Sequence, residues 1–214
     1  MALIAPSMLS ADFLNLGKDV RMVNEHADLF HLDIMDGVMV PNISYGFPVV
    51  EAIAREAKKP LDVHLMIVHP EKYIGRFAKA GAAMISFHAE AAEDPAAILE
   101  MTKAEGVKAG LAFNPDYPID KVLPLLEKCD FALIMSVFAG FGGQKFIEAT
   151  WSRLETVRKW IDSHGLDCKI EVDGGVTPDN AGALSSAGAD ILVAGSAVFK
   201  AADPADVIRR MKSL

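Results

Sequence analysis

The stretch His31-Leu32-Asp33-Ile34-Met35-Asp36-Gly37 decides the fold of this chain. It belongs to a short apolar run, residues 29–35, that is bounded by Gly37 and Pro41, which is typical of a buried strand ending in a turn. Because residues two apart on a strand share a face, His31 and Asp33 point the same way. Polar groups inside an apolar strand are costly unless they are bonded, so this face indicates either a hydrogen-bonded core pair or a binding site.

The same pattern of short apolar runs and helical segments continues on both sides of this stretch. Strands are predicted at residues 4–9, 29–35, 61–66, 84–87, 108–113, 131–137, 169–172 and 191–194. Helices are predicted at residues 14–23, 49–58, 70–80, 95–105, 119–127, 151–163, 180–187 and 204–211, with a cap for the first helix at residues 10–12 and a short helical turn at 197–199.

Eight strand–helix units in 214 residues, about 27 residues each, predict a (β/α)8 TIM barrel that forms a single α/β domain over residues 1–214. The similar segments Ala80-Gly81-Ala82 and Ala187-Gly188-Ala189-Asp190 are what a repeated unit would produce. A doubly wound open sheet is the alternative, but the glycine-rich dinucleotide motif does not follow the first predicted strand. The active site of a barrel lies at the carboxyl ends of its strands.

Composition limits the classes of partner. The chain is 51% hydrophobic, which is enough for a full core, and its net charge of -8 argues against nucleic acid or an anionic membrane surface. The two cysteines, Cys129 and Cys168, have no framework spacing and fit a reducing compartment. Since no apolar run approaches the length of a membrane span, we expect a cytoplasmic protein.

Several polar residues fall at the predicted carboxyl ends of strands. Two histidines and two aspartates on different strands can converge and bind a divalent metal such as zinc, iron, manganese or cobalt. The alternative is a buried hydrogen-bonded cluster without metal. The polar residues at these ends are Ser7, His31, Asp33, His64, His88, Glu90 and Asp173.

Glycines cluster after the sixth, seventh and eighth predicted strands. Barrel enzymes commonly bind phosphate at these loops, through backbone N–H groups and the start of a short extra helix, which residues 197–199 would supply here. Each cluster alone is a weak signal because turns need glycine anyway. The clusters are Gly140-Phe141-Gly142-Gly143, Gly174-Gly175 and Gly195-Ser196.

The two aspartates suggest a reaction. Asp33 and Asp173 would approach a small substrate from opposite sides of the barrel mouth. A metal between them would polarise a carbonyl oxygen, while one aspartate removes a neighbouring proton and the other returns one to the opposite face. The outcome is epimerisation or racemisation of a phosphorylated carbonyl compound.

At these residues the sequence resembles the ribulose-phosphate 3-epimerase family, nearly from end to end. The matching segments are residues 5–13, residues 31–37 with Val40-Pro41-Asn42, and residues 62–66, 140–144, 171–175 and 194–199. The resemblance implies a barrel of the ribulose-phosphate-binding type that interconverts D-ribulose 5-phosphate and D-xylulose 5-phosphate through a cis-enediolate.

The resemblance also implies roles for individual residues. His31, Asp33, His64 and Asp173 would bind one divalent metal, and Asp33 and Asp173 would be the two acid/base groups. Ser7 and His64 would contact substrate, and the loop glycines with Ser196 would hold its phosphate. Met35, Met66 and Met135 match methionines that line the site in this family, although they are equally good core residues. For His88 and Glu90 we favour a supporting or structural role.

Two loops depart from the family pattern. Phe138-Ala139 stands where the family usually has Asn-Pro, and Val38-Met39 where it usually has His-Phe. Both positions are expected over the mouth, so an allulose 6-phosphate 3-epimerase, which acts on a six-carbon ketose, is the second candidate. A barrel that binds sugar phosphate without turnover is a third candidate, but it would not need two opposed carboxylates. A decarboxylase or aldolase would need a lysine at a strand end, and none is found.

The expected partners follow from the same resemblance. They are a phosphorylated ketose and further copies of the chain, in a homo-oligomer that would be a hexamer or a dimer.

Overall fold

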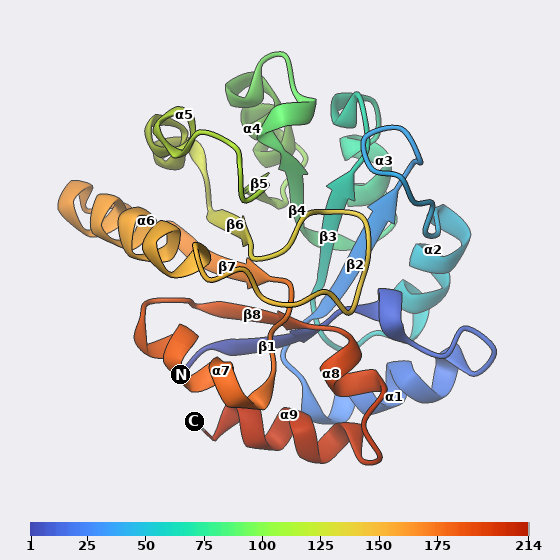
Figure 1. Ribbon diagram of the computed structural model, residues 1–214. Helices are drawn as coiled ribbons and strands as arrows, with labels where there is room; N and C mark the ends of the chain where they lie inside the picture. The colour runs from blue at the N-terminus through green and yellow to red at the C-terminus, as the bar shows by residue number, and fades with distance from the viewer. Residues whose placement is uncertain (214) are drawn as a thin grey trace.

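Eight parallel strands alternate with helices in the computed structural model, which describes residues 1–213 (Figure 1). Leu214, the last residue of the predicted 1–214 domain, lies outside the described residues. The predicted (β/α)8 barrel is confirmed. The strands are β1 (Leu3–Pro6), β2 (Phe30–Met35), β3 (Leu61–Met66), β4 (Ala82–His88), β5 (Lys108–Phe113), β6 (Phe131–Met135), β7 (Lys169–Asp173) and β8 (Ile191–Ala194).

The helices surround the strands (Figure 1). No helix within residues 1–213 has both the length and the apolar character that crossing a membrane requires. The α-helices are α1 (Leu16–His26), α2 (Phe47–Glu56), α3 (Ile74–Lys79), α4 (Pro95–Ala104), α5 (Ile119–Val122), α6 (Thr150–His164), α7 (Pro178–Ser186), α8 (Ser196–Phe199) and α9 (Pro204–Lys212), and the 3-10 turns are η1 (Met8–Ser10), η2 (Pro70–Lys72), η3 (Ala89–Ala91) and η4 (Leu123–Lys128).

The strands form one curled sheet in the order β1-β8-β7-β6-β5-β4-β3-β2, with every neighbouring pair parallel. The remaining seam, between β1 and β2, is closed by an isolated parallel bridge between Ser7 and His31. The backbone N–H of Asp28 also donates across the seam to the carbonyl of Ile4 at 3.0 Å. The last contact that completes the barrel therefore lies between two predicted site residues.

The interior of the barrel changes character along its axis. At the amino ends of the strands it is apolar, and the Phe131 ring fills it. The ring packs so closely on Gly110 that a Cβ there would lie 2.2 Å from it. Along β2 the alternation then leads from the buried Leu29 to His31 and Asp33 on the same face. The apolar layer consists of Ala5, Leu29, Met84, Phe131, Ile191 and Val193. The barrel thus carries its buried polar groups toward the carboxyl ends of the strands.

Some predicted boundaries are wrong. Residues 10–12 do not cap α1, which begins at Leu16, because Asp12 instead accepts hydrogen bonds from Leu14 and Asn15 in the preceding turn. The predicted helix at residues 119–127 is a short α5 followed by a 3-10 segment, since Pro124 has no N–H to continue an α-helical ladder.

Candidate active site

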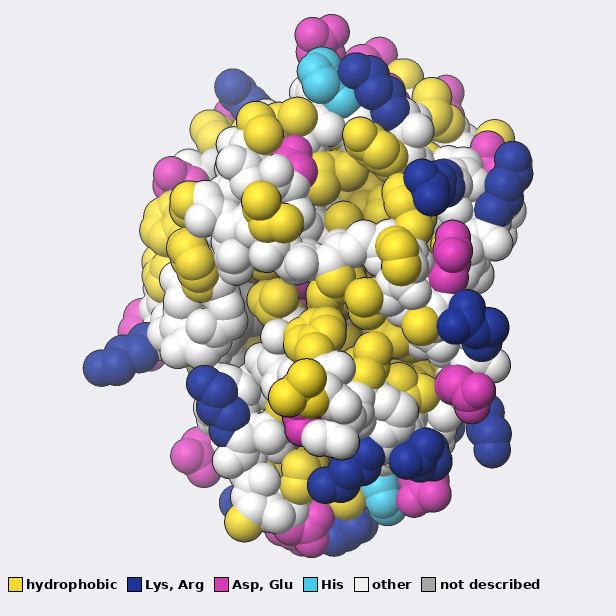
Figure 2. Space-filling model, turned by 90° about the vertical axis from the view of Figure 1, so that its right-hand side faces the viewer, with side chains coloured by type: hydrophobic (Ala, Val, Ile, Leu, Met, Phe, Trp, Pro, Cys, Tyr) yellow, Lys and Arg dark blue, Asp and Glu magenta, His cyan; other side chains and the backbone are white. Residues whose placement is uncertain are grey.

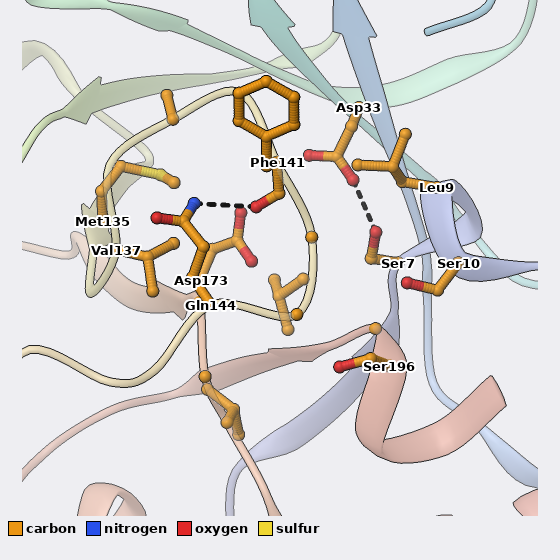
Figure 3. Close-up of a pocket in the computed structure, with 18 of the residues that line it drawn as sticks. Ser7, Leu9, Ser10, Asp33, Met135, Val137, Phe141, Gln144, Asp173 and Ser196 are labelled. Atoms are coloured by element: carbon orange, nitrogen blue, oxygen red, sulfur yellow. Dashed lines mark hydrogen bonds between the residues drawn. The ribbon is translucent and has the colours of Figure 1, made fainter. Parts of the chain in front are cut away.

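A pocket of about 520 Å³ opens at the carboxyl ends of the strands, where a barrel places its active site (Figure 3). The predicted substrate-binding residues line it, except His64, which is fully buried. The predicted residues in the lining are Ser7, Met35, Met66, Met135, Gly140, Phe141, Gly142, Gly143, Gly174, Gly175, Gly195 and Ser196.

The four predicted metal ligands converge at the base of this pocket. His31 Nε2 lies 3.3 Å from Asp33 Oδ1 and 3.8 Å from Asp173 Oδ2. His64 Nδ1 lies 3.3 Å and 3.7 Å from the same two oxygens. One atom from each of the four residues lies within 4.8 Å of the others. The barrel therefore brings together four side chains from β2, β3 and β7.

These four atoms fit a divalent cation. A tetrahedral ion with ligand bonds of about 2.0–2.2 Å requires ligand atoms about 3.3–3.6 Å apart, close to the separations observed. His31 Nε2 and His64 Nδ1 are buried and have no hydrogen-bond partner in the structure. An orphaned buried nitrogen is costly, and a cation between the carboxylates would satisfy both nitrogens.

His31 is held by two carboxylates that the sequence interpretation did not single out. Its Nδ1 atom lies 2.6 Å from Asp62 Oδ2, to which it donates a hydrogen bond, and 3.3 Å from Glu171 Oε1. Asp62 and Glu171 are fully buried. Period-two spacing before His64 and Asp173 was the signal for both, since each precedes a predicted ligand on the same strand face. These partners fix the ring so that Nε2 faces the centre.

His64 is held from the opposite side by His88. The two Nε2 atoms are 2.9 Å apart, and His88 Nδ1 lies 3.2 Å from Glu90 Oε1. Neither His88 nor Glu90 belongs to the group of four converging ligands. The contacts agree with a supporting role for this pair, because they reach the ring nitrogen of His64 that faces away from the centre.

Asp33 and Asp173 differ in their protonation. Burial alone would raise the pKa of Asp33, but the neighbouring His31 and His64 hold it well below the usual range. Burial, together with the charge of Asp33, raises the pKa of Asp173 to about 7. Ser7 Oγ donates a hydrogen bond to Asp33 Oδ2 at 2.6 Å, which further favours the ionised form (Figure 3). The centre thus pairs an ionised carboxylate with a carboxyl that is partly protonated near neutral pH.

The pKa values of His31 and His64 are also shifted in opposite directions. Burial alone would lower the pKa of His31, but Asp33 and Asp62 raise it well above its ordinary value. Burial lowers the pKa of His64 to about 4, and the neighbouring imidazoles contribute in the same direction. His64 is therefore neutral at physiological pH, which is the form that binds metal.

The glycine loops after β6, β7 and β8 lie side by side on one side of the pocket. A Cβ on Gly175, whose φ is +61°, would lie 2.5 Å from the backbone nitrogen of Phe146, so this close approach requires glycine. At the start of α8 the N–H groups of Val198 and Phe199 donate to the carbonyl of Gly195, which leaves those of Ser196 and Ala197 without an acceptor within the helix. Lys145 and Lys200 also line the pocket and supply positive charge that the sequence interpretation missed.

One wall of the pocket is apolar. Met35 and Met66 pack with Val40, and Ala139 lies against this group and also against the neighbouring cluster that contains Met135. The three methionines are nearly buried and line the pocket at the same time. Figure 2 shows a face on which hydrophobic side chains gather around a recess, with most charged side chains near the edge.

The two departures from the family pattern lie in different surroundings. Phe138 and Ala139 line the pocket. Val38 is 72% exposed and lines a separate groove with Ile43 and Tyr45. Met39 packs with Ala139 against the methionines of the pocket wall, so the expectation that both departures lie over the mouth agrees with the positions of Phe138-Ala139 and Met39, while the side chain of Val38 is exposed to solvent.

Comparisons with known proteins agree with this geometry. A family model, the Ribulose-phosphate 3 epimerase family, matches residues 3–199. The chain is 48% identical over 213 residues to the ribulose-phosphate 3-epimerase of Synechocystis sp., covering 98% of this chain and 93% of that protein. It is 45% identical to that of Escherichia coli K12, covering 99% and 95%. Among solved structures, KGPDC from Streptococcus mutans has a TM-score of 0.76 at 13% identity over 100% of this chain and 96% of that one, which shows the fold alone.

Proposed function

The chain belongs to the ribulose-phosphate 3-epimerase family and is an isomerase, and we propose that it inverts C3 of D-ribulose 5-phosphate to give D-xylulose 5-phosphate. The observation that carries the proposal is the convergence of Asp33 and Asp173, from β2 and β7, at one centre at the base of the pocket. Two carboxyl groups on two sides of a carbon, one that takes a proton and one that gives a proton, are what inversion requires.

Asp33 and Asp173 carry the two proton transfers. They reach the pocket from β2 and β7 (Figure 3). Oδ1 of Asp33 faces the imidazoles, so Oδ2, held by the Ser7 hydroxyl, takes the C3 proton. Oδ2 of Asp173 also faces the imidazoles, so Oδ1 delivers a proton to the opposite face of the resulting enediolate. The reverse reaction exchanges the two roles.

The proposed ligands of one divalent cation are His31 Nε2, His64 Nδ1 and one oxygen from each of Asp33 and Asp173. When bound, zinc, iron, manganese or cobalt would polarise the substrate's carbonyl and stabilise the negative charge that develops there. Asp62 keeps the Nδ1 atom of His31 occupied as a donor, which leaves the Nε2 lone pair for the cation.

The remaining pocket residues position the substrate. The N–H groups around Gly142, Gly174 and Ser196 are suited to the phosphate, with Lys200 supplying charge. The apolar wall formed by the methionines excludes water from the reacting carbon, which strengthens the electrostatic interactions at the centre. Ser7 would contact the substrate oxygen nearest the cation, whereas His64 is fully buried and has its two ring nitrogens directed at the cation and at His88, so we assign it to the cation alone.

The alternatives fit less well. The relatives from Synechocystis and E. coli are named for ribulose-phosphate, so the six-carbon alternative is not favoured. A barrel that only binds sugar phosphate would have no need for two opposed carboxylates at one centre.

The proposal is tested by incubating the purified protein with D-ribulose 5-phosphate in D2O. We expect chelator-sensitive formation of D-xylulose 5-phosphate with deuterium at C3, since the aspartates exchange their protons with solvent. D-allulose 6-phosphate is the matched six-carbon control. Faster turnover of this control would transfer the proposal to the six-carbon ketose, and no turnover of either substrate in the presence of Co²⁺ or Mn²⁺ would overturn the proposed catalysis.

Assembly and location stay predictions. We propose a homo-oligomer, a hexamer or a dimer, in the cytoplasm. Light scattering on the purified protein measures the number of copies, and a monomeric mass would contradict the first of these predictions.

A further inference from the structure

A chain of polar contacts runs from His64 to the glycine-rich loop after β6. His64 Nε2 lies 2.9 Å from His88 Nε2, and His88 Nδ1 lies 3.2 Å from Glu90 Oε1. Asn114 Nδ2 donates to Glu90 Oε1 at 2.7 Å. Asn114 Oδ1 in turn accepts a hydrogen bond from the backbone N–H of Ala139 at 2.9 Å. These contacts, of which only the one between His88 and Glu90 is not an aligned hydrogen bond, join a proposed metal ligand to a loop that lines the pocket.

Asn114 links the two halves of this path, and only one orientation of its side-chain amide satisfies both hydrogen bonds. Its oxygen faces the N–H donor of Ala139, and its NH2 group therefore faces the Glu90 carboxylate. The reverse orientation would set donor against donor and oxygen against oxygen. The bond from Ala139 thus sets which side-chain group of Asn114 faces Glu90, and the backbone N–H of Asn114 donates to the same Glu90 oxygen at 3.0 Å.

The position of Glu90 affects which ring nitrogen of His64 carries the proton and which carries the lone pair. A carboxylate beside His88 Nδ1 favours the proton on that atom, which leaves His88 Nε2 to accept from the Nε2–H of His64. The lone pair of His64 is then on Nδ1, facing the centre. His88 Nδ1 has no aligned hydrogen bond in the structure, so a small movement of Glu90 decides whether this contact forms.

The loop end of the path depends on the residue at position 139. Ala139 donates through its backbone N–H, which a proline at this position would lack. We infer that Asn114 is a positioning residue that couples its hydrogen bond from the backbone N–H of Ala139 to cation binding at His64. This inference rests on the proposed metal site. Because coupling is reciprocal, cation binding steadies the loop as much as the loop contact tightens cation binding.

The inference is tested with Co²⁺ alone, without substrate, on A139P and N114A. The first variant removes only the loop donor, and the second removes both side-chain bonds of Asn114 while the backbone N–H at position 114 stays on Glu90. Each is expected to weaken Co²⁺ binding about tenfold, the lower end of the effect of losing an outer partner of a metal ligand. In the wild-type protein Co²⁺ should slow hydrogen exchange of the amides at residues 141–143, and both variants should lose this Co²⁺-dependent protection.

Gln144→Ala is the matched control. Gln144 Nε2 donates to the carbonyls of Phe138 and Phe141, so its removal loosens the same loop without touching Asn114. Faster loop exchange with unchanged Co²⁺ affinity is expected, and a tenfold loss of affinity in this variant would assign the effect to general loosening and overturn the inference.

Two further outcomes are decisive. Unchanged Co²⁺ affinity in A139P and N114A, with a wild-type protein that binds Co²⁺, overturns the coupling and leaves the proposed function intact. A wild-type protein that does not bind Co²⁺ overturns the proposed metal site itself. If A139P does not fold, N114D decides, because it keeps the acceptor for Ala139 but sets a carboxylate against Glu90 and should weaken binding like N114A.

Discussion

The two ends of the barrel differ in whether their polar groups have hydrogen-bond partners. At the amino end, an apolar layer around Phe131 fills the interior. Three aspartates near that end each accept a backbone N–H from a neighbouring strand: Ile4 N donates to Asp28 at 2.9 Å, Ala109 N to Asp130 at 2.8 Å, and Ile170 N to Asp190 at 2.9 Å. At the carboxyl end, the buried nitrogens of His31 and His64 face the centre without a hydrogen-bond partner.

This difference separates stability from function. At the amino end, each hydrogen-bonded aspartate stabilises the start of the strand whose N–H it accepts. The apolar layer stabilises the fold because its side chains are removed from water. An unsatisfied polar group at the carboxyl end costs stability until a ligand supplies its partner. Substitutions at the two ends should therefore change different measurable properties.

The largest effect is expected from Asp173→Asn at the carboxyl end. Turnover should fall by about 10²–10⁴-fold because the variant cannot transfer a proton. The melting temperature should change little, since asparagine closely resembles the protonated form that the raised pKa of Asp173 favours. Kinetics and a thermal melt on the same sample check both expectations, and an active variant would rule out the two-base mechanism.

Phe131→Ala tests the amino end. The ring is 1% exposed and fills the apolar layer, so its loss should lower the free energy of unfolding by about 3–5 kcal/mol. Urea denaturation measures this change, and Co²⁺ affinity of the folded variant should match the wild type. A large loss of affinity would show that the two ends are not independent.

Cation binding should weaken as the pH falls. The pKa of His31 is raised and that of Asp173 is raised to about 7, so at lower pH protons occupy more of the ligand atoms that the cation needs. Affinity for Co²⁺ should fall about tenfold per pH unit below 7 for each proton displaced. Calorimetry in buffers of different ionisation enthalpy counts the protons, and binding without proton release would contradict this expectation.

The smallest effect is expected from Asp130→Ala. The variant loses the hydrogen bond from the N–H of Ala109 and a half-exposed ion pair with Lys103 that contributes little, and stability should fall by about 1 kcal/mol. Turnover should not change because Asp130 is at the end opposite to the pocket. Urea denaturation measures the stability of the variant and of the wild type, and initial rates measure their turnover. Asp190→Ala is a second variant at an equivalent strand start.

Much of the barrel follows from local patterns. The strands at residues 61–66, 108–113 and 191–194 have the predicted boundaries because each is a short apolar run between clear breakers. The failures lie where one residue changes the backbone, as Pro124 does in converting the end of a helix into a 3-10 segment. Turns after β1 were also missed, because local side-chain bonds of Asp12 compete with helix formation there.

The sequence by itself determined the eight repeated units and the face of each strand on which His31, Asp33, His64 and Asp173 stand, because a period of two is a local property of the backbone. Only the tertiary structure decided which nitrogen of each imidazole faces the centre, and that Asn114 contacts both Glu90 and Ala139. These contacts join residues far apart in the chain, and their distances depend on strand register and on closure of the barrel between β1 and β2.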